Sequence, residues 1–442
     1  MRIAIVGSGI SGLAVAHRLA DHARVTLFEA ADYFGGHTHT VDVELQVAGR
    51  PVRHGVDTGF LVFNERTYPK LIALFAELDV ETSPSNMSFS VQAADPKSGR
   101  HLEWSGSNLS SVFSQRRNLA SPRFLGMLRD LARFNRLAQD IASAGQEWQL
   151  QQSLGEFLHQ NRFGQAFIDW YFLPMVACIW SCPTAQMLQF PVATMIRFCH
   201  NHGLNQVSNR PQWWTVNGGA RHYVDKIVAR VADTRLNTPV RAIERHGASG
   251  GVTVTTDQGS EHFDRVVLAT HSDQALALLR DASAAECRTL GAIRYHPNLA
   301  VLHTDTTVLP RHPRAWAAWN YESAPAELAT AGTHGQAVCL HYLLNRLQPL
   351  PWQQPVLVSL NPLRAIREEY VLGQYRYAHP MFDRTAIAAQ QQMEALQGQR
   401  NTYYCGAWMG YGFHEDGLKA GLAVARHLLA DIDPRVVERM AA

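Results

Sequence analysis

The sequence predicts an α/β protein: a doubly wound, Rossmann-type dinucleotide-binding domain that is discontinuous in the chain and carries an inserted α+β domain. Three observations support this class. The chain opens with a strand, a glycine turn, a helix and a second strand; a buried strand-like run ends near residue 270; and a third ends at Gly406, before a helical pattern. Strands that alternate with helices indicate a parallel sheet. We assign 1–82, 212–290 and 395–442 to the dinucleotide-binding domain, and 83–211 and 291–394 to an inserted substrate domain with a helical cap.

The strongest pattern lies in the first 30 residues. Arg2–Val6 is a short apolar run that leads into the glycine motif Gly7–Gly12 and then into a helical pattern. In such a motif the first glycine permits a tight turn, the second lets a pyrophosphate approach the backbone, and the third lets the helix pack on the sheet. The helix N-terminus faces the phosphates, and Glu29 accepts the ribose hydroxyls. The residues expected at the dinucleotide are Gly7, Ser8, Gly9, Ser11, Gly12, Glu29 and Ala30.

A second glycine pair follows the acid. Gly35 and Gly36 stand shortly after Glu29 and precede His37 and Thr38. This order resembles the flavin-containing amine oxidase superfamily, which also holds carotenoid desaturases and protoporphyrinogen oxidases. The resemblance implies a two-domain, amine oxidase-like flavoprotein with FAD as cofactor, and it places these four residues at the FAD. The family usually has Arg where this chain has His37.

Composition excludes several other classes. The 442 residues carry a net charge of +2 with the basic residues widely spread, which gives no support for nucleic-acid binding. No run of 18 apolar residues exists, so we expect no membrane span. Six cysteines without a metal-type spacing indicate reduced thiols in a cytoplasmic protein. His37, His39 and His54 lack the spacing and the carboxylate of a metal site, so we expect no metal.

The segment after the second glycine pair predicts a hairpin and then a helix. Val41–Val47 alternates apolar and polar residues and Pro51–Arg53 returns, while Tyr68–Pro69 opens a helix with a leucine-rich face. Between them the resemblance implies flavin contacts for Asp57, Thr58, Gly59 and Phe60. A carboxylate that only closes a turn is an equally good interpretation of Asp57.

A basic amphipathic segment marks the inserted domain. Its arginines are Arg116, Arg117, Arg123, Arg129, Arg133 and Arg136, and Phe124, Leu128, Leu131 and Phe134 form the opposite face. Such a helix can lie on an anionic membrane, which would make the protein peripheral at the inner membrane. A solvated face over a packed stripe is the more ordinary interpretation.

The rest of the inserted domain supplies apolar and catalytic candidates. Residues 167–191 are apolar and aromatic, and prolines break them into short helices that we assign to the lining of a substrate pocket. The 375–380 cluster provides three catalytic candidates, Arg376, Tyr377 and His379, although a strand with a polar face would give the same pattern.

Later segments return to the cofactor. The resemblance places the backbone of Val240 at the adenine and Thr270 at the end of a strand that passes the dinucleotide. Near the C-terminus, a strand ends at Gly406, and a helix opens close to residue 414, where its N-terminal dipole can stabilise a reduced flavin. The resemblance assigns Gly406, Ala407, Phe413, His414 and Glu415 to the FAD, and His414 is also a catalytic candidate.

The resemblance implies hydride transfer to FAD, and the sequence limits the class of substrate. Many family members hold a lysine near the flavin, but none occurs between Lys226 and Lys419. An aromatic pocket without this lysine favours an apolar substrate, such as a fatty acyl chain, methylated or not, into which the enzyme introduces a double bond. The sequence resembles one bacterial branch of the superfamily, which is similar to flavoproteins linked to modifying the fatty acyl chains of phospholipids. The alternatives are an amine oxidase acting on a small or aromatic amine with O2, and a non-enzymatic partner-binding protein of the GDP-dissociation-inhibitor type. We expect noncovalent FAD, because no cysteine lies between Cys339 and Cys405.

Overall fold

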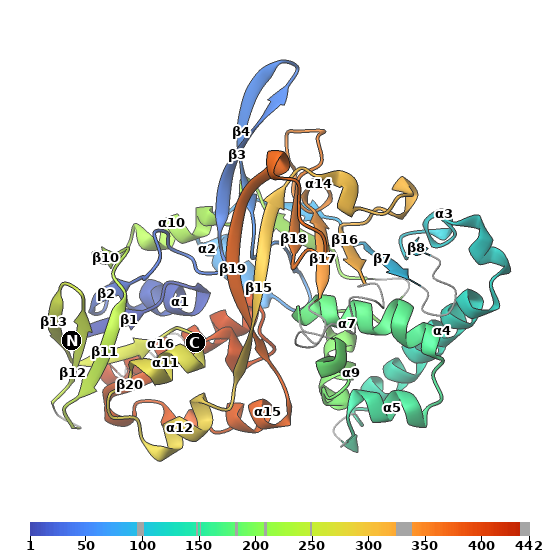
Figure 1. Ribbon diagram of the computed structural model, residues 1–442. Helices are drawn as coiled ribbons and strands as arrows, with labels where there is room; N and C mark the ends of the chain where they lie inside the picture. The colour runs from blue at the N-terminus through green and yellow to red at the C-terminus, as the bar shows by residue number, and fades with distance from the viewer. Residues whose placement is uncertain are drawn as a thin grey trace.

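The computed structural model describes residues 1–94, 101–146, 149–150, 152–181, 184–206, 210–247, 250–323 and 338–433. Two lobes lie side by side, and the β3–β4 hairpin projects from the region between them (Figure 1). One lobe is built on a parallel sheet and the other on a mostly antiparallel sheet with helices packed against it. The predicted α/β fold class is confirmed.

The first lobe, which we call the dinucleotide-binding domain, contains a five-stranded parallel sheet of order β10-β2-β1-β14-β20. Its strands come from widely separated parts of the chain. They are β1 (Arg2–Val6), β2 (Arg24–Phe28), β10 (Asp233–Arg235), β14 (Arg265–Leu268) and β20 (Thr402–Tyr404). In register, Ile5 lies between Leu27 of β2 and Val267 of β14. The predicted strand–helix–strand opening is therefore confirmed.

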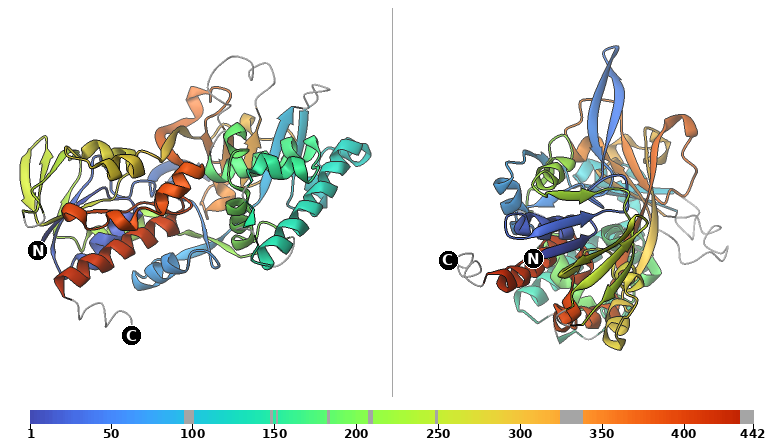
Figure 2. Two further views of the ribbon diagram at one scale, coloured as in Figure 1. Left: turned by 90° about the horizontal axis from the view of Figure 1, so that it is seen from below. Right: turned by 90° about the vertical axis from the view of Figure 1, so that its left-hand side faces the viewer.

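Both faces of this sheet are covered, as expected for parallel strands. Ile3 and Ile5 of β1 pack with helices on one side, whereas Ala4 and Val6 pack on the other side with a three-stranded sheet. The helices are α1 (Ile10–Leu19), α2 (Pro69–Glu77), α10 (Arg221–Val228) and α16 (His414–Ile432), and the opposite layer holds β11 (Val240–Arg245), β12 (Val252–Thr256), β13 (Gly259–Phe263), α11 (Ser272–Leu278) and α12 (Ala284–Leu290). The long α16 runs along the underside of this lobe (Figure 2).

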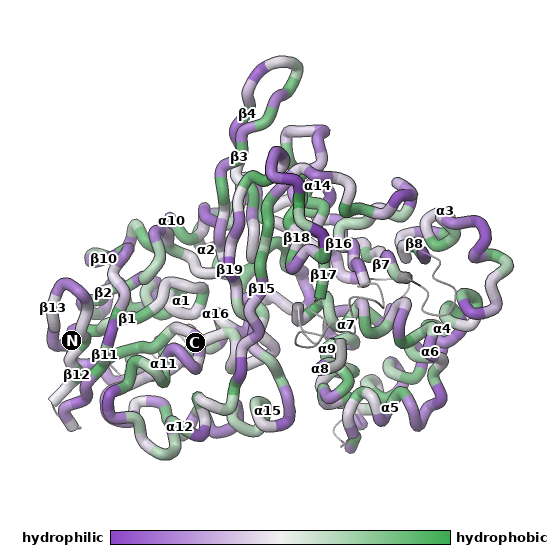
Figure 3. The backbone as a smooth tube through the Cα atoms, in the orientation of Figure 1, coloured by the Kyte–Doolittle hydropathy of each residue, from purple (hydrophilic) through white to green (hydrophobic). Residues whose placement is uncertain are grey.

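The second lobe, the inserted domain, contains a seven-stranded sheet of order β19-β15-β18-β17-β16-β7-β8. All neighbours are antiparallel except β16 and β7. Its strands β15, β17 and β18 show long hydrophobic stretches (Figure 3). The strands are β7 (Phe89–Ala94), β8 (His101–Ser105), β15 (Arg294–His303), β16 (Trp319–Glu322), β17 (Cys339–Leu343), β18 (Leu357–Leu360) and β19 (Val371–Met381).

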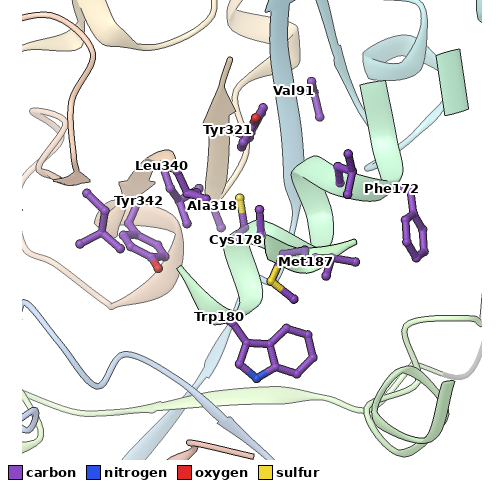
Figure 4. Packing of buried hydrophobic residues seen from close by; sticks show 14 of the residues in the cluster. Val91, Phe172, Cys178, Trp180, Met187, Ala318, Tyr321, Leu340 and Tyr342 are labelled. Atoms are coloured by element: carbon purple, nitrogen blue, oxygen red, sulfur yellow. The ribbon is translucent and has the colours of Figure 1, made fainter. Parts of the chain in front are cut away.

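Helices from residues 109–201 pack on this sheet. Figure 4 shows Tyr321, Leu340 and Tyr342 of the strands close to Cys178 and Trp180 of α7, within one hydrophobic core. The helical elements are α3 (Leu109–Val112), η1 (Arg116–Ala120), α4 (Pro122–Ser143), α5 (Leu154–Gln160), α6 (Gln165–Phe167), the π-helical η3 (Ile168–Phe172), α7 (Leu173–Trp180), α8 (Thr184–Met187) and α9 (Val192–Asn201).

Small elements join the two lobes. The predicted hairpin is β3 (Thr40–Val47) with β4 (Arg50–Asp57), and the predicted helix after Tyr68 is α2. A three-stranded sheet combines β5 (Phe63–Asn64), β9 (Trp213–Val216) and β6 (Thr82–Ser85). The remaining short helical elements are η4 (Thr306–Val308), η5 (Pro313–Ala315), α14 (Leu344–Leu347), η6 (Glu368–Tyr370), α15 (Arg384–Gln390), η7 (Glu394–Leu396), η8 (Gln399–Asn401) and η9 (Ala407–Met409).

In the part of the chain that the structure describes, no helix has both the length and the apolar composition needed to cross a bilayer.

Candidate active site

A cavity of about 710 Å³ is lined by residues of both lobes. One end is formed by the β1–α1 loop, Glu29 and the second glycine pair, and the other by aromatic side chains of the inserted domain. The predicted cofactor residues that line it are Gly7, Ser8, Gly9, Ser11, Glu29, Ala30, Gly35, Gly36, His37, Thr58, Gly59, Phe60, Val240, Thr270, Gly406, Ala407, Phe413 and His414. Sequence-distant segments thus meet at one elongated cavity.

The glycine motif has the geometry of a dinucleotide cradle. A Cβ on Gly12 would lie 2.0 Å from the Gly7 carbonyl oxygen, so only glycine lets α1 pack this closely on the end of β1. A Cβ on Gly9 would meet no protein atom within 4 Å, because this residue faces the cavity. Gly9 is also the N-cap of α1 and has no side chain to occupy the free N–H groups. These groups can therefore bind a pyrophosphate.

Glu29 lies beside this cradle and lines the cavity. Its carboxylate accepts hydrogen bonds from Ser8 N at 3.0 Å, Ser8 Oγ at 2.5 Å and Ala31 N at 3.0 Å. These bonds hold the acid at the end of β2, where a ribose would reach it. The open cradle, the uncapped helix end and the oriented acid together fit the adenosine diphosphate half of FAD.

Five predicted site residues do not line the cavity. Gly12 lies behind it, in the helix packing just described. The side chain of Thr38 is buried, and its Oγ1 makes hydrogen bonds with Tyr223 Oη at 2.6 Å and with His414 Nε2 at 3.2 Å, so it positions His414. Arg376 is exposed, because strand alternation in β19 turns Tyr377 and His379 toward the cavity instead. The other two are Asp57 and Glu415.

Asp57 is a buried structural carboxylate. It accepts hydrogen bonds from Thr40 Oγ1 at 2.5 Å, Ala220 N at 3.0 Å and Gln348 Nε2 at 2.7 Å. Burial raises its pKa to about 6, although these donors act in the opposite direction. The carboxylate therefore joins β3, β4 and the start of α10, which corresponds to the structural interpretation rather than to a flavin contact.

Glu415 binds the start of another helix. Its carboxylate accepts hydrogen bonds from Lys70 N at 3.1 Å and Leu71 N at 2.9 Å, at the N-terminus of α2, and its side chain is buried. The side chain therefore connects α16 to α2 and does not line the cavity. The sequence pattern aligned the residue with a family glutamate but carried no signal about α2.

We expect Glu415→Ala to lower the free energy of unfolding by about 1–3 kcal/mol, because two helix N–H groups lose their acceptor. The dissociation constant for FAD should change by less than about threefold. Urea unfolding and flavin titration measure the two effects. Glu394→Ala, at an exposed ion pair with His427, is the control and should change stability by less than about 0.5 kcal/mol. If the variant loses FAD while its stability is unchanged, Glu415 contributes to the cofactor site.

Besides His202, which stacks on Phe198, four histidines line the cavity: His37, His271, His379 and His414. The ring centroids of His37 and His379 are 5.4 Å apart, and those of His37 and His271 are 6.2 Å apart. Burial lowers the pKa of His37 and His271 to about 4, and that of His379 and His414 to about 3. All four rings are therefore neutral at pH 7, and this wall carries no charge.

Hydrogen bonds orient part of this wall. Asn298 Nδ2 donates to His379 Nδ1 at 3.0 Å, which leaves the proton of a neutral His379 on Nε2. Tyr377 Oη makes hydrogen bonds with Thr58 Oγ1 at 2.7 Å and with His39 Nδ1 at 3.2 Å. His37 Nε2, in contrast, is buried and has no hydrogen-bond partner among the described residues.

The far end of the cavity is aromatic. Trp180 and Phe198 have ring centroids 4.6 Å apart, and Phe198 stacks on Phe413 at 5.2 Å. Trp319, Tyr342 and Leu360 of the seven-stranded sheet also line this end. Among the described residues that line the cavity, Glu29 is the one acidic side chain, and none is a lysine or an arginine.

Sequence reasoning missed several of these residues. His271 comes from a segment without a recognisable motif and lines the cavity, and Asn298 reaches its wall through the hydrogen bond to His379. From residues 167–191, which we expect to line the pocket, Ile179, Trp180 and Ser181 do so. The aromatic side chains Trp170, Tyr171, Phe172 and Phe190 lie instead in the hydrophobic core of the inserted domain.

One group in the described part of the chain could meet a metal ion at a common point: Glu322, Cys339 and His341, outside the cavity. His341 Nε2 lies 3.0 Å from Glu322 Oε2, and His341 Nδ1 lies 2.6 Å from Ser359 Oγ. Arg364 pairs with the other oxygen of Glu322 at 3.3 Å. The imidazole of His341 and the carboxylate of Glu322 therefore have hydrogen-bond and ion-pair partners within the protein.

Comparison with known proteins agrees with this geometry. The sequence model of the family described as flavin containing amine oxidoreductase matches residues 10–332. The chain therefore belongs to this family, and it is an FAD-dependent oxidoreductase. The non-enzymatic alternative is not supported. No curated protein matches the sequence.

Solved structures share the fold. One is described as a protoporphyrinogen oxidase from Exiguobacterium sp. 255-15, with 16% identity, a TM-score of 0.65, and 97% of this chain and 99% of that chain covered. A second is a fatty acid isomerase from P. acnes that produces CLA, with 16% identity, a TM-score of 0.62, and coverage of 97% and 98%. A third is cyclohexylamine oxidase from Brevibacterium oxydans IH-35A, with 17% identity, a TM-score of 0.59, and coverage of 97% and 99%. At these identities the similarity establishes the fold alone.

Proposed function

We propose that this oxidoreductase removes hydride from a fatty acyl chain, methylated or unbranched, and introduces a double bond. The observation that carries the proposal is the aromatic half of the cavity, in which the described lining residues include no charged side chain. Such a surface binds hydrocarbon by burying it, and offers no ion pair to an ammonium group. The similarity to a fatty acid isomerase in fold is compatible with an acyl substrate.

The chain's own residues have three tasks in this reaction. Bound FAD supplies the hydride acceptor. Trp180, Phe198 and Trp319 hold the acyl chain and exclude water. Desaturation also releases a proton from the adjacent carbon, and we assign its uptake to the neutral imidazole of His37, which lines the cavity. His379, whose Nδ1 accepts a bond from Asn298, is positioned to orient the substrate through its Nε2–H.

An anaerobic reduction experiment tests the proposal. We expect an acyl phospholipid to bleach the visible band of the bound flavin, and putrescine or cyclohexylamine to leave it unchanged. Photoreduction of the same sample is the control that the flavin can accept electrons. Bleaching by an amine but not by the phospholipid would contradict the acyl proposal and support amine oxidation. After acid precipitation the flavin should remain in the supernatant, as expected for noncovalent FAD.

A further inference from the structure

Three exposed leucines lie close together in the chain at one end of the inserted domain. Leu109 at the start of α3 has 79% of its surface exposed, Leu119 in η1 has 56%, and Leu125 in the first turn of α4 has 44%. Among the described residues, the other large hydrophobic side chains of this kind are Met1, Leu299 and Leu372. The labels α3 and α4 stand at the end of the molecule away from the parallel sheet (Figure 1). Three consecutive elements, α3, η1 and α4, thus each expose one leucine.

The same segment is strongly basic. From Leu109 to Arg136 the sequence has six arginines and one acidic residue, Asp130, although the whole chain carries a net charge of only +2. Asp130 is buried, and its carboxylate accepts a hydrogen bond from Gly164 N at 2.8 Å. The carboxylate of Asp130 therefore bonds mainly within the domain, and the exposed surface of this segment is positively charged.

Helical spacing places leucine and arginine on one side of α4. Leu125, Arg129 and Arg136 are exposed, whereas Phe124 and Phe134 are buried in the core. The side chain of Arg129 is 81% exposed and pairs only loosely, at 3.8 Å, with Asp130. The aromatic face of α4 is therefore packed, and its outer face presents leucine and arginine together.

We propose that Leu109, Arg116, Leu119, Leu125, Arg129 and Arg136 form a docking surface for an anionic lipid bilayer. Single leucines between arginines fit the headgroup boundary, where apolar tips enter the acyl region and guanidinium groups remain with the phosphates. The charge is complementary to anionic lipids. A protein interface would instead call for a continuous apolar centre with few charges. The inference does not depend on the acyl substrate, but it would bring the enzyme to one.

Co-sedimentation with vesicles tests the surface. We expect the holoenzyme to bind phosphatidylglycerol vesicles, to bind phosphatidylcholine vesicles at least about tenfold more weakly, and to be released by salt. Combined Leu109→Ser, Leu119→Ser and Leu125→Ser should weaken binding by about tenfold or more. Leu299→Ser with Leu372→Ser is the matched control: two exposed leucines elsewhere are changed, and binding should be retained.

Outcomes for binding and for catalysis can be separated. The triple leucine variant should keep its bound flavin and its reduction by a detergent-dispersed acyl substrate, because none of the three residues lines the cavity. Equal binding of wild-type and triple-variant protein to phosphatidylglycerol vesicles would overturn the docking surface, as would no binding at all. Vesicle binding without acyl-driven reduction would contradict only the proposed function.

Discussion

Gly12→Ala is expected to destabilise the dinucleotide-binding domain by at least about 2 kcal/mol, although alanine is ordinarily the better helix former. The added Cβ would lie 2.0 Å from the Gly7 carbonyl oxygen and 3.1 Å from Ala269 Cβ. Neither neighbour is the end of a flexible side chain, so α1 must shift away from the sheet. Urea unfolding of flavin-free protein measures the loss, and the purified variant should contain little flavin.

Gly9→Ala is the matched variant, with the same substitution three residues earlier. Its Cβ would meet no protein atom within 4 Å, so the stability of the flavin-free protein should change by less than about 1 kcal/mol. The methyl group would occupy the space where a pyrophosphate approaches, so we expect the affinity for FAD to fall about a hundredfold, or about 2.7 kcal/mol. If Gly9→Ala binds FAD normally, the cofactor does not lie on this turn.

These two glycines show why the cofactor end was predictable. A turn, a helix N-terminus and an acid lie within 30 residues, and each leaves a local signal in the sequence: glycine where a Cβ has no room, apolar residues at strand and helix periods, and a carboxylate after the second strand. The resulting strand–helix–strand unit needs little information from the rest of the chain.

The substrate end lacked such signals because long-range packing assembles it. His271, Asn298 and His379 come from three separate segments, and no spacing in the sequence reveals that Asn298 fixes the proton of His379. Arg376 and His379 looked equivalent as polar residues of one cluster, and only the pairing of β19 with β15 shows which of them faces the cavity. Glu415 matches a family pattern, yet Lys70, whose backbone N–H it accepts, lies 345 residues earlier in the chain.

The buried histidines lead to a second large effect, a loss of stability in acid. Six histidines have pKa values lowered by burial to about 4 or about 3: His37, His202, His271, His303, His379 and His414. In the unfolded chain each titrates near 6.5, so between pH 6.5 and 4 the unfolded state binds more protons than the folded state. The free energy of unfolding must therefore fall as the pH falls through this window.

Four carboxyls whose pKa is raised by burial oppose this trend: Asp57, Asp169, Glu415 and Asp416. Burial raises the pKa of Asp57 and Asp416 to about 6, so acidification from pH 6 toward 4 stabilises the fold at these positions. The six histidines outweigh the four carboxyls, because more groups destabilise the fold in acid than stabilise it. A pKa difference of one between the folded and unfolded states corresponds to about 1.4 kcal/mol for each group. We expect urea unfolding of the flavin-free protein to show a loss of several kcal/mol between pH 7 and 5.

His341 has a pKa shift of the opposite sign and serves as a comparison for the loss of stability in acid. Burial acts to lower its pKa, but Cys339 and Glu322 outweigh that effect and raise it to about 9. Its contribution is therefore present below pH 6.5 and is lost as the pH rises through 9, outside the acid window. His341→Gln should lower stability at neutral pH and alter the slope between pH 6.5 and 4 only through its neighbours His303 and Glu322. His37→Gln combined with His379→Gln should change that slope more and make it shallower. A slope that does not respond to the double variant would mean that both rings are already solvated in the folded protein, and the uncharged wall inferred for the cavity would not exist.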